Sequence, residues 1–366
     1  MSNFDSRKFN RDLIEHKDPK VERVLKKLTS PRFFLRNESI WDVPPGILIG
    51  LVNEIENKFC GKNWEDLREV DKFVFEDEET FDLIMTSELE KDCLMYHPAD
   101  YKDWWDDTVD KLFNYVKDNN LKTLVLGISG GLDSAVCAAI AWKVSKLIGV
   151  RSIGISLPIV NTSGEITSAD LTGNAWYSPK DYITIPLSEA YKATREVLVR
   201  AEEENPGLGA QTKIADGNIM ARLRMITLYN FAGVNKGMVL STGNKTENLL
   251  GFFTIHGDEP MDYNLLDDLY KTEVYRLARW IRDNIAETNE QKKALQTAID
   301  ITPTDGLGIS SSDLEQIGAE SYYQVDRILE KETEKVRIDI SDIPEEIVEK
   351  VLGRVKASEF KQRFIL

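Results

Sequence analysis

The order of apolar segments from residue 105 onward is the feature that most constrains the fold. Short runs rich in apolar residues occur at 123–128, 151–159, 181–187 and 237–242, and segments with helical spacing or many alanines lie between them. Such short runs are typical of strands that are buried on both faces of a parallel sheet. Strands that alternate with helices build an α/β fold. The sequence therefore predicts a parallel twisted sheet flanked by helices.

Composition excludes several classes of protein. The chain has 366 residues, and its 46 basic and 62 acidic side chains give a net charge of −16. An acidic balance argues against a protein that coats nucleic acid, and no apolar run approaches the roughly 18 residues of a membrane span. We therefore expect neither a nucleic-acid partner nor a membrane partner. A small polyanionic ligand is still compatible with the charge, because a bound metal ion can invert the local field.

Cysteine and histidine are too sparse for a metal cluster. The three cysteines, Cys60, Cys93 and Cys137, form no Cys-x-x-Cys pair, and the chain has only three histidines. We therefore expect neither a zinc cluster nor a disulfide framework. The first residues carry no apolar signal segment, so a reducing, cytoplasmic setting is expected.

The chain is interpreted as two regions. Residues 1–100 include the dense acidic stretch 71–92, in which apolar residues interrupt the charges. Because a disordered acidic tail would lack those apolar residues, we expect a mainly helical N-terminal extension of unknown role. Residues 101–366 are expected to form the α/β domain.

A glycine-rich loop follows the first apolar run and precedes an alanine-rich helical segment. It reads Gly127-Ile128-Ser129-Gly130-Gly131-Leu132-Asp133-Ser134. The adjacent glycines Gly130 and Gly131 allow a sharp turn, and the backbone N–H groups that start the next helix favour a bound anion. The hydroxyls of Ser129 and Ser134 add donors. Asp133 would need a cation between itself and a phosphate, and Mg²⁺ suits that place. A strand–turn–helix connection without a ligand is the alternative interpretation.

This loop is neither of the common nucleotide-binding motifs. It lacks the lysine of the GxxxxGK[ST] phosphate loop and the spacing of GxGxxG. The string Ser-Gly-Gly-x-Asp-Ser resembles the pyrophosphate-binding loop of the N-type ATP pyrophosphatases. That resemblance implies the Rossmann-like fold of the adenine-nucleotide alpha hydrolases and ATP contacts from residues 127–134. It also implies cleavage of ATP between its α- and β-phosphates.

Further motifs narrow the resemblance. They occur in order at residues 221–225, 240–264, 268–272, 303–307 and 358–361. With the loop, they resemble the NAD synthetase family over roughly residues 105–366. The resemblance implies that deamido-NAD (nicotinic acid adenine dinucleotide) is amidated with ATP and ammonia through an NAD-adenylate, with release of AMP and pyrophosphate. It also implies a homodimer.

The resemblance also implies roles for individual residues in the ATP chemistry. Asp133 and Glu247 would share Mg²⁺, and Lys271 would stabilise charge on the triphosphate. Thr242 and Thr304 would contact ATP. Taken alone, Glu247 and Lys271 also have an ordinary interpretation, because charged side chains are mostly solvated at the surface.

Four residues are implied in the binding of deamido-NAD. They are Arg222, Asp258, Asp262 and Lys361. The planar guanidinium of Arg222 suits a phosphate or a carboxylate. The chain departs from the family pattern at Ile255-His256 and at Phe360, and these changes bear on the substrate site more than on the ATP chemistry.

Free ammonia, or ammonia from a separate protein, is the expected nitrogen source. Residues 1–100 are too few for the glutaminase domain that some relatives carry, and Cys60 and Cys93 lie in no recognisable nucleophile motif. Two alternatives stay open. One is another N-type ATP pyrophosphatase ligase that adenylates a different acceptor, and the other is a catalytically silent nucleotide-binding relative. The retained carboxylates and lysine argue against the silent relative.

Overall fold

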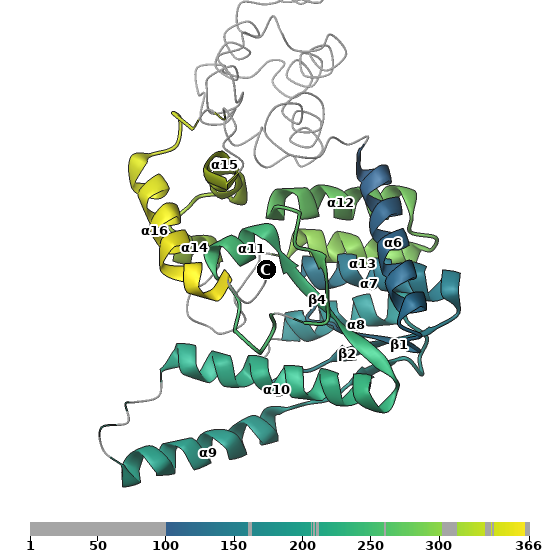
Figure 1. Ribbon diagram of the computed structural model, residues 1–366, viewed down its shortest axis with the longest axis horizontal. Helices are drawn as coiled ribbons and strands as arrows, with labels where there is room; N and C mark the ends of the chain where they lie inside the picture. Colours follow the sequence, from purple (N-terminus) through teal and green to yellow (C-terminus); the bar gives the residue numbers. More distant parts are fainter. Residues whose placement is uncertain are drawn as a thin grey trace, which may run out of the picture. The chain divides into compact units, whose positions relative to one another are not determined.

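The computed structural model describes residues 100–362, apart from 160–162, 206, 208, 210–211, 260, 302–312, 334–337 and 339. The chain divides into two compact units, one of residues 99–333 and 345–366 and the other of residues 1–98 and 334–344. The first unit contains the sheet and is drawn in colour in Figure 1. The predicted helical extension over residues 1–100 lies outside the described residues.

A five-stranded parallel sheet forms the centre of the first unit. Its strands are β1 (Thr123–Gly127), β2 (Arg151–Ser156), β3 (Tyr182–Thr184), β4 (Gly237–Asn244) and β5 (Tyr263–Leu266). Their order across the sheet is β3-β2-β1-β4-β5, and every neighbouring pair is parallel. The predicted parallel α/β class is confirmed. The sequence did not predict β5, and it placed the end of β4 two residues too early.

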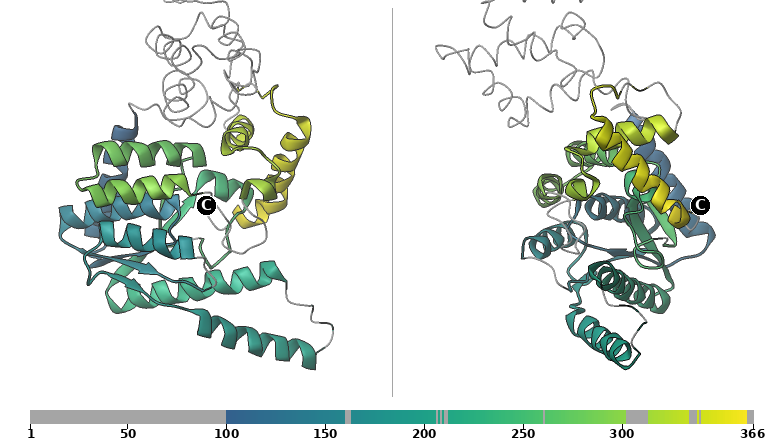
Figure 2. Two further views of the ribbon diagram at one scale, coloured as in Figure 1. Left: turned by 180° about the vertical axis from the view of Figure 1, so that it is seen from behind. Right: turned by 90° about the vertical axis from the view of Figure 1, so that its left-hand side faces the viewer.

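Helices cover both faces of the sheet (Figures 1 and 2). The helices among the described residues are α6 (Asp100–Asp118), α7 (Leu132–Ile148), α8 (Ser163–Trp176), α9 (Ser188–Glu204), α10 (Lys213–Val234), α11 (Lys245–Leu250), α12 (Lys271–Asn284), α13 (Asn289–Asp300), α14 (Asp313–Ile317), α15 (Tyr322–Thr333) and α16 (Glu345–Gln362). On one face α7 and α8 contact the strands, with α12 and α13 packed behind them, and α10 covers the other face. None of the described helices is both long and apolar enough to cross a membrane.

The core has an apolar layer on each face of the sheet because successive strand side chains point to opposite faces. Val125 and Val239 pack with Leu228 and Ala232 of α10. Leu124 and its neighbours on the opposite face are equally buried. The alanines of α7 let that helix approach the strands closely, and ten of its residues are buried. Burial on both faces explains why the strands appeared in the sequence as continuous apolar runs.

The strand order also determines where a ligand can bind. Connections leave β1 toward β2 on one side, while β4 lies on the other side of β1. Open α/β sheets bind ligands at the carboxyl ends of strands at such a reversal of order. The glycine loop follows β1. Residues 242–244 end β4 and residues 245–247 begin α11, so both segments lie at this reversal.

Candidate active site

The glycine loop makes the turn from β1 into α7. Gly130 has a φ of +91°, a backbone conformation that a residue with a Cβ rarely adopts. Its carbonyl accepts a hydrogen bond from Ser168 Oγ at 2.7 Å, which ties the loop to α8. Ser129 Oγ accepts from Gly131 N at 3.2 Å and donates to Ser134 Oγ at 3.1 Å. The loop is therefore fixed by its own side chains, and the first turn of α7 begins at its end.

Asn244 connects the two carboxylate residues of the site. It caps α11, because its Oδ1 accepts from Glu247 N at 3.0 Å. Its Nδ2 donates to Asp133 Oδ1 at 2.8 Å. The β4–β5 register shifts between Ser241 and Asn244, and such irregularities redirect side chains next to active sites. Asn244 was not predicted as a site residue from the sequence, although Asn-x-x-Glu before a helix is a visible capping signature.

Lys271, the first residue of α12, extends its ammonium between the two carboxylates. Its side chain is 3% exposed, and Nζ lies 2.5 Å from Asp133 Oδ2 and 2.9 Å from Glu247 Oε1. Burial lowers the pKa of Lys271, but Asp133 and Glu247 outweigh burial and raise the pKa well above its ordinary value. Lys271 is therefore a permanent cation at neutral pH, and it is held by the two carboxylates that were expected to hold a metal ion.

The same pair of carboxylates fits a divalent cation. Both reach a single nitrogen atom, so their oxygens already converge on one point, and both side chains retain some exposure, at 13% and 22%. Mg²⁺ is commonly held by one or two carboxylates together with substrate phosphates. Among the described residues, no group of three or more His, Cys, Asp or Glu side chains offers an all-protein metal site. The donor set therefore fits Mg²⁺ that arrives with a nucleotide.

Two acidic residues, Asp258 and Glu259, hold the segment between α11 and β5. Asp258 Oδ1 accepts from Thr254 N at 2.5 Å. Glu259 bonds to the end of β4. Its Oε1 accepts from Ser241 Oγ and also from Gly243 N, the latter at 3.0 Å. Burial is the main reason that the pKa values of both carboxyls are raised, and that of Glu259 reaches about 7. Glu259 is a buried acid that the sequence analysis did not single out.

The remaining residues implied in deamido-NAD binding either bond to the segment between α11 and β5 or, in the case of Asp262, belong to it. Arg222 Nη2 donates to Ile255 O at 3.2 Å. Asp262 accepts from Val239 N at 2.8 Å and from Tyr229 Oη at 3.0 Å. Lys361 of α16 donates to two backbone carbonyls, at 2.7 Å and 2.6 Å, in the segment 251–253. These side chains hold residues 251–259 and 261–262, between α11 and β5, beside the carboxylate cluster.

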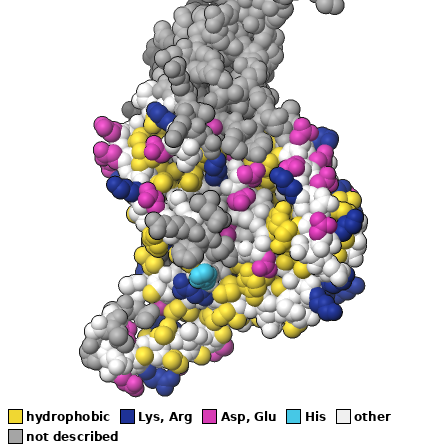
Figure 3. All heavy atoms as spheres, viewed as in Figure 1, with side chains coloured by type: hydrophobic (Ala, Val, Ile, Leu, Met, Phe, Trp, Pro, Cys, Tyr) yellow, Lys and Arg dark blue, Asp and Glu magenta, His cyan; other side chains and the backbone are white. Residues whose placement is uncertain are grey.

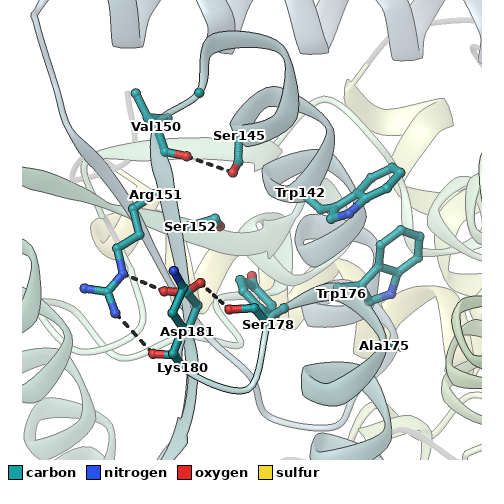
Figure 4. Close-up of a pocket in the computed structure, with 12 residues that line it drawn as sticks. Trp142, Ser145, Val150, Arg151, Ser152, Ala175, Trp176, Ser178, Lys180 and Asp181 are labelled. Carbon is teal, nitrogen blue, oxygen red and sulfur yellow. Dashed lines mark hydrogen bonds and ion pairs between the residues drawn. The ribbon is translucent and has the colours of Figure 1, made fainter.

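A separate cavity lies near the amino ends of strands β2 and β3 (Figure 4). It has a volume of about 640 Å³, and its lining includes Trp142 of α7 and the Arg151–Asp181 ion pair, at 2.6 Å, near the starts of β2 and β3. It contains none of the residues implied by the motifs. Because ligands of open α/β sheets bind at the carboxyl ends of strands, this cavity is not the candidate active site.

The family assignment rests on a match over most of the chain. Residues 104–364 match the family model described as NAD synthase. The chain belongs to the NAD synthase family. The resemblance found in the sequence motifs is thereby confirmed.

Two curated relatives are similar over most of their own length. The chain is 36% identical over 208 residues to the NH(3)-dependent NAD(+) synthetase of Thermoplasma acidophilum, covering 57% of this chain and 76% of that protein. It is 31% identical over 261 residues to the NH(3)-dependent NAD(+) synthetase of Methanosarcina mazei, covering 69% and 94%. Among solved structures, NMN synthetase from Francisella tularensis aligns with a TM-score of 0.59 at 23% identity, covering 74% of this chain and 98% of that chain. The structural similarity concerns the fold.

Within this NAD synthase fold, the predicted ATP-site residues are only partly gathered. The structure brings Asp133, Glu247 and Lys271 into direct contact, next to the glycine loop. Thr242 is half-buried within β4. Thr304 lies outside the described residues. Cys137 is buried behind the loop, where burial raises the pKa of its thiol well above the ordinary value and makes it a poor nucleophile.

Proposed function

We propose that this chain is an ammonia-dependent NAD synthetase, which amidates deamido-NAD with ATP and releases AMP and pyrophosphate. The observation that carries the proposal is the contact of Lys271 with Asp133 and Glu247 beside the glycine loop, in a chain of the NAD synthase family. The contact gathers one cation and two carboxylates at the sheet edge where α/β folds bind ligands.

The reaction takes two displacements. A carboxylate oxygen of the nicotinate attacks the α-phosphorus of ATP, and pyrophosphate leaves with the electrons of the broken bond. The nitrogen of ammonia then attacks the acyl carbon of the NAD-adenylate, loses a proton, and AMP leaves. Neither step requires a protein nucleophile, so catalysis consists mainly of positioning and charge stabilisation.

The chain's own residues supply the charge and the geometry. The start of α7 directs backbone N–H groups at the phosphates. Lys271 stays protonated, so it stabilises developing negative charge rather than acting as a base. Asp133 and Glu247 would hold Mg²⁺, which neutralises phosphate charge and makes pyrophosphate a better leaving group. Thr242 and the glycine loop lie at the same carboxyl ends of the strands, β4 and β1.

Residues 251–259 and 261–262 are proposed as one wall of the deamido-NAD site. Arg222 is exposed and uses only part of its guanidinium on Ile255 O, so donors are left for a phosphate or carboxylate. Asp258 and Lys361 bond to the backbone of this wall, and Asp262 fastens its end to Val239 N of β4. The substrate would then contact a wall whose backbone these hydrogen bonds hold in place.

A homodimer is proposed from the surface of α9 and α10. These helices present exposed apolar side chains, among them Val197 (56% exposed), Ile226 (59%) and Val234 (72%), and no residue of α9 is buried. Figure 3 shows hydrophobic side chains gathered over these two helices. Apolar surface of this kind marks interaction sites, and a second copy of the chain is the proposed partner. The mass of the full chain in solution tests this part.

A single incubation tests the reaction. The full chain is mixed with MgATP, deamido-NAD and ammonium, and NAD, AMP and pyrophosphate are measured, with glutamine replacing ammonium in a parallel sample. We expect equal amounts of NAD and AMP with ammonium and none with glutamine alone. ADP in place of AMP would contradict the pyrophosphatase chemistry. AMP formed only with another acceptor would exclude deamido-NAD as the substrate. We propose that the protein works in the cytoplasm, where it has access to ATP.

A further inference from the structure

A buried aspartate lies behind the carboxylate–lysine cluster. Asp326 of α15 is 1% exposed. Its Oδ1 accepts from Thr246 Oγ1 at 2.5 Å, and its Oδ2 accepts from Thr272 N at 2.8 Å. One carboxylate therefore bonds to the first turn of α11 and to the first turn of α12 at the same time.

Thr246 adds a direct hydrogen bond between α11 and α12. Thr246 is fully buried, and its hydroxyl also accepts from Lys271 N at 2.8 Å. Thr246 immediately precedes Glu247, and Thr272 immediately follows Lys271. The three hydrogen bonds thus join the backbone beside Glu247 to the backbone beside Lys271. The side chains of those two residues meet at 2.9 Å on the far side of the connection.

We propose that Asp326 and Thr246 are positioning residues, which hold Glu247 and Lys271 at the separation that the reaction requires. Both act through the two helix starts, because their hydrogen bonds go to Lys271 N and Thr272 N and to each other rather than to the charged atoms of the cluster. The inference rests on the proposed function, because it assigns a purpose to the placement of Glu247 and Lys271.

The chemistry of the connection favours positioning over simple packing. A buried carboxylate is costly unless it is well hydrogen-bonded, and an apolar side chain of similar size is often the more stable choice at such a place. Burial accordingly raises the pKa of Asp326 to about 6, although Thr246 and Thr272 donate to it. An ionised carboxylate accepts at both oxygens, so it can serve two donors from two helices, which no apolar side chain can do.

Thr246→Val is the first test, because valine keeps the shape of threonine and removes the hydroxyl. We expect kcat to fall by about 10- to 100-fold through misplaced catalytic groups. KM for deamido-NAD should stay within about threefold, since binding contacts are intact. The Mg²⁺ concentration for half-maximal rate should rise, because Glu247 is displaced. Thr246→Ser retains the hydroxyl and should restore most of kcat.

Tyr270→Phe is the matched control. Tyr270 Oη and Thr333 Oγ1 lie 2.9 Å apart, a contact that also joins α15 to the residue before Lys271 but touches neither Lys271 N nor Thr272 N. Its loss should lower the melting temperature and leave kcat within about twofold of wild type. A merely structural connection would make Thr246→Val behave in the same way.

The outcomes separate this inference from the proposed function. If the wild-type chain makes no NAD, the proposed function fails. If the wild type is active and folded Thr246→Val keeps its kcat and its Mg²⁺ dependence, the inference is overturned. Where Thr246→Val does not fold, Asp326→Asn replaces it, because the amide has one acceptor for two donors and keeps the size of the side chain. A loss of kcat at nearly constant KM supports the inference, and unchanged kcat overturns it.

Discussion

Glu259 is expected to make the stability of this protein fall as pH rises, and Glu259→Gln should remove that dependence. The side chain is 2% exposed, and its carboxyl oxygen accepts from Gly243 N at 3.0 Å. Burial, and then the nearby charges of Asp258 and Glu247, raise its pKa from 4.5 to about 7. The folded protein therefore favours the protonated acid.

The sign follows from proton binding. Below about pH 4.5 the carboxyl is protonated in both states, so it favours neither. Between about pH 4.5 and pH 7 the unfolded chain loses this proton while the folded chain keeps it, so stability falls as pH rises. Above about pH 7 both forms are ionised, and the penalty is constant. At about 1.36 kcal/mol for each pKa unit, the full penalty is about 3 kcal/mol.

Glutamine is a close substitute for the protonated acid. Its amide oxygen can still accept from Ser241 and Gly243. Its NH₂ group can donate, and Asn248 Oδ1 is a buried acceptor close to Gly243 with no hydrogen-bond partner among the described residues. Glu259→Gln should therefore cost little at low pH and should gain relative to wild type as pH rises.

Thermal unfolding of both proteins across about pH 5 to pH 8 measures the effect. The Tm of Glu259→Gln minus that of wild type should increase by roughly 6–12 °C over this range, since about 3 kcal/mol corresponds to that shift for a unit of this size. Glu204→Gln, at the exposed end of α9, is the control for loss of one negative charge. A Tm difference that does not change with pH would refute the reasoning.

Three further changes test the site and its surroundings. Asp133→Asn should lower kcat by about 100-fold or more with little change in Tm, and full turnover by this variant would contradict its role. Lys361→Met should lower Tm by removing two donors to backbone carbonyls, each worth about 1 kcal/mol. A higher KM for deamido-NAD at unchanged Tm would instead indicate that Lys361 binds substrate. Val234→Asp should halve the mass in ultracentrifugation, whereas Leu147→Asp, exposed on α7, should not.

The parts of the fold that could be predicted are those that local patterns determine. The strands of the buried sheet were visible because burial on both faces leaves apolar runs. The glycine loop was visible because a φ of +91° at Gly130 favours glycine. Strand β5 was missed because Tyr263–Leu266 is short and only its last two residues are buried.

The parts that could not be predicted depend on contacts between distant segments. Asp326 bonds to Thr246, eighty positions away along the chain. Asn244 reaches Asp133 across 111 positions. Nothing in the composition around either residue distinguishes it from a surface helix residue or an ordinary cap. Only the packing of α15 and β4 against the helix starts shows what these side chains do.

The charge of the site explains how an acidic protein can bind polyanionic nucleotides. Lys271 is shared by Asp133 and Glu247, so this cluster of one cation and two anions has no positive charge to spare. A triphosphate that approached alone would meet repulsion from the carboxylates at this edge of the sheet. A triphosphate that carried Mg²⁺ would bring a cation that Asp133 and Glu247 could hold, and the Lys271 ammonium would then be available to stabilise phosphate charge. We therefore expect the carboxylates to favour the metal complex of the nucleotide, so that the net charge of −16 need not oppose binding.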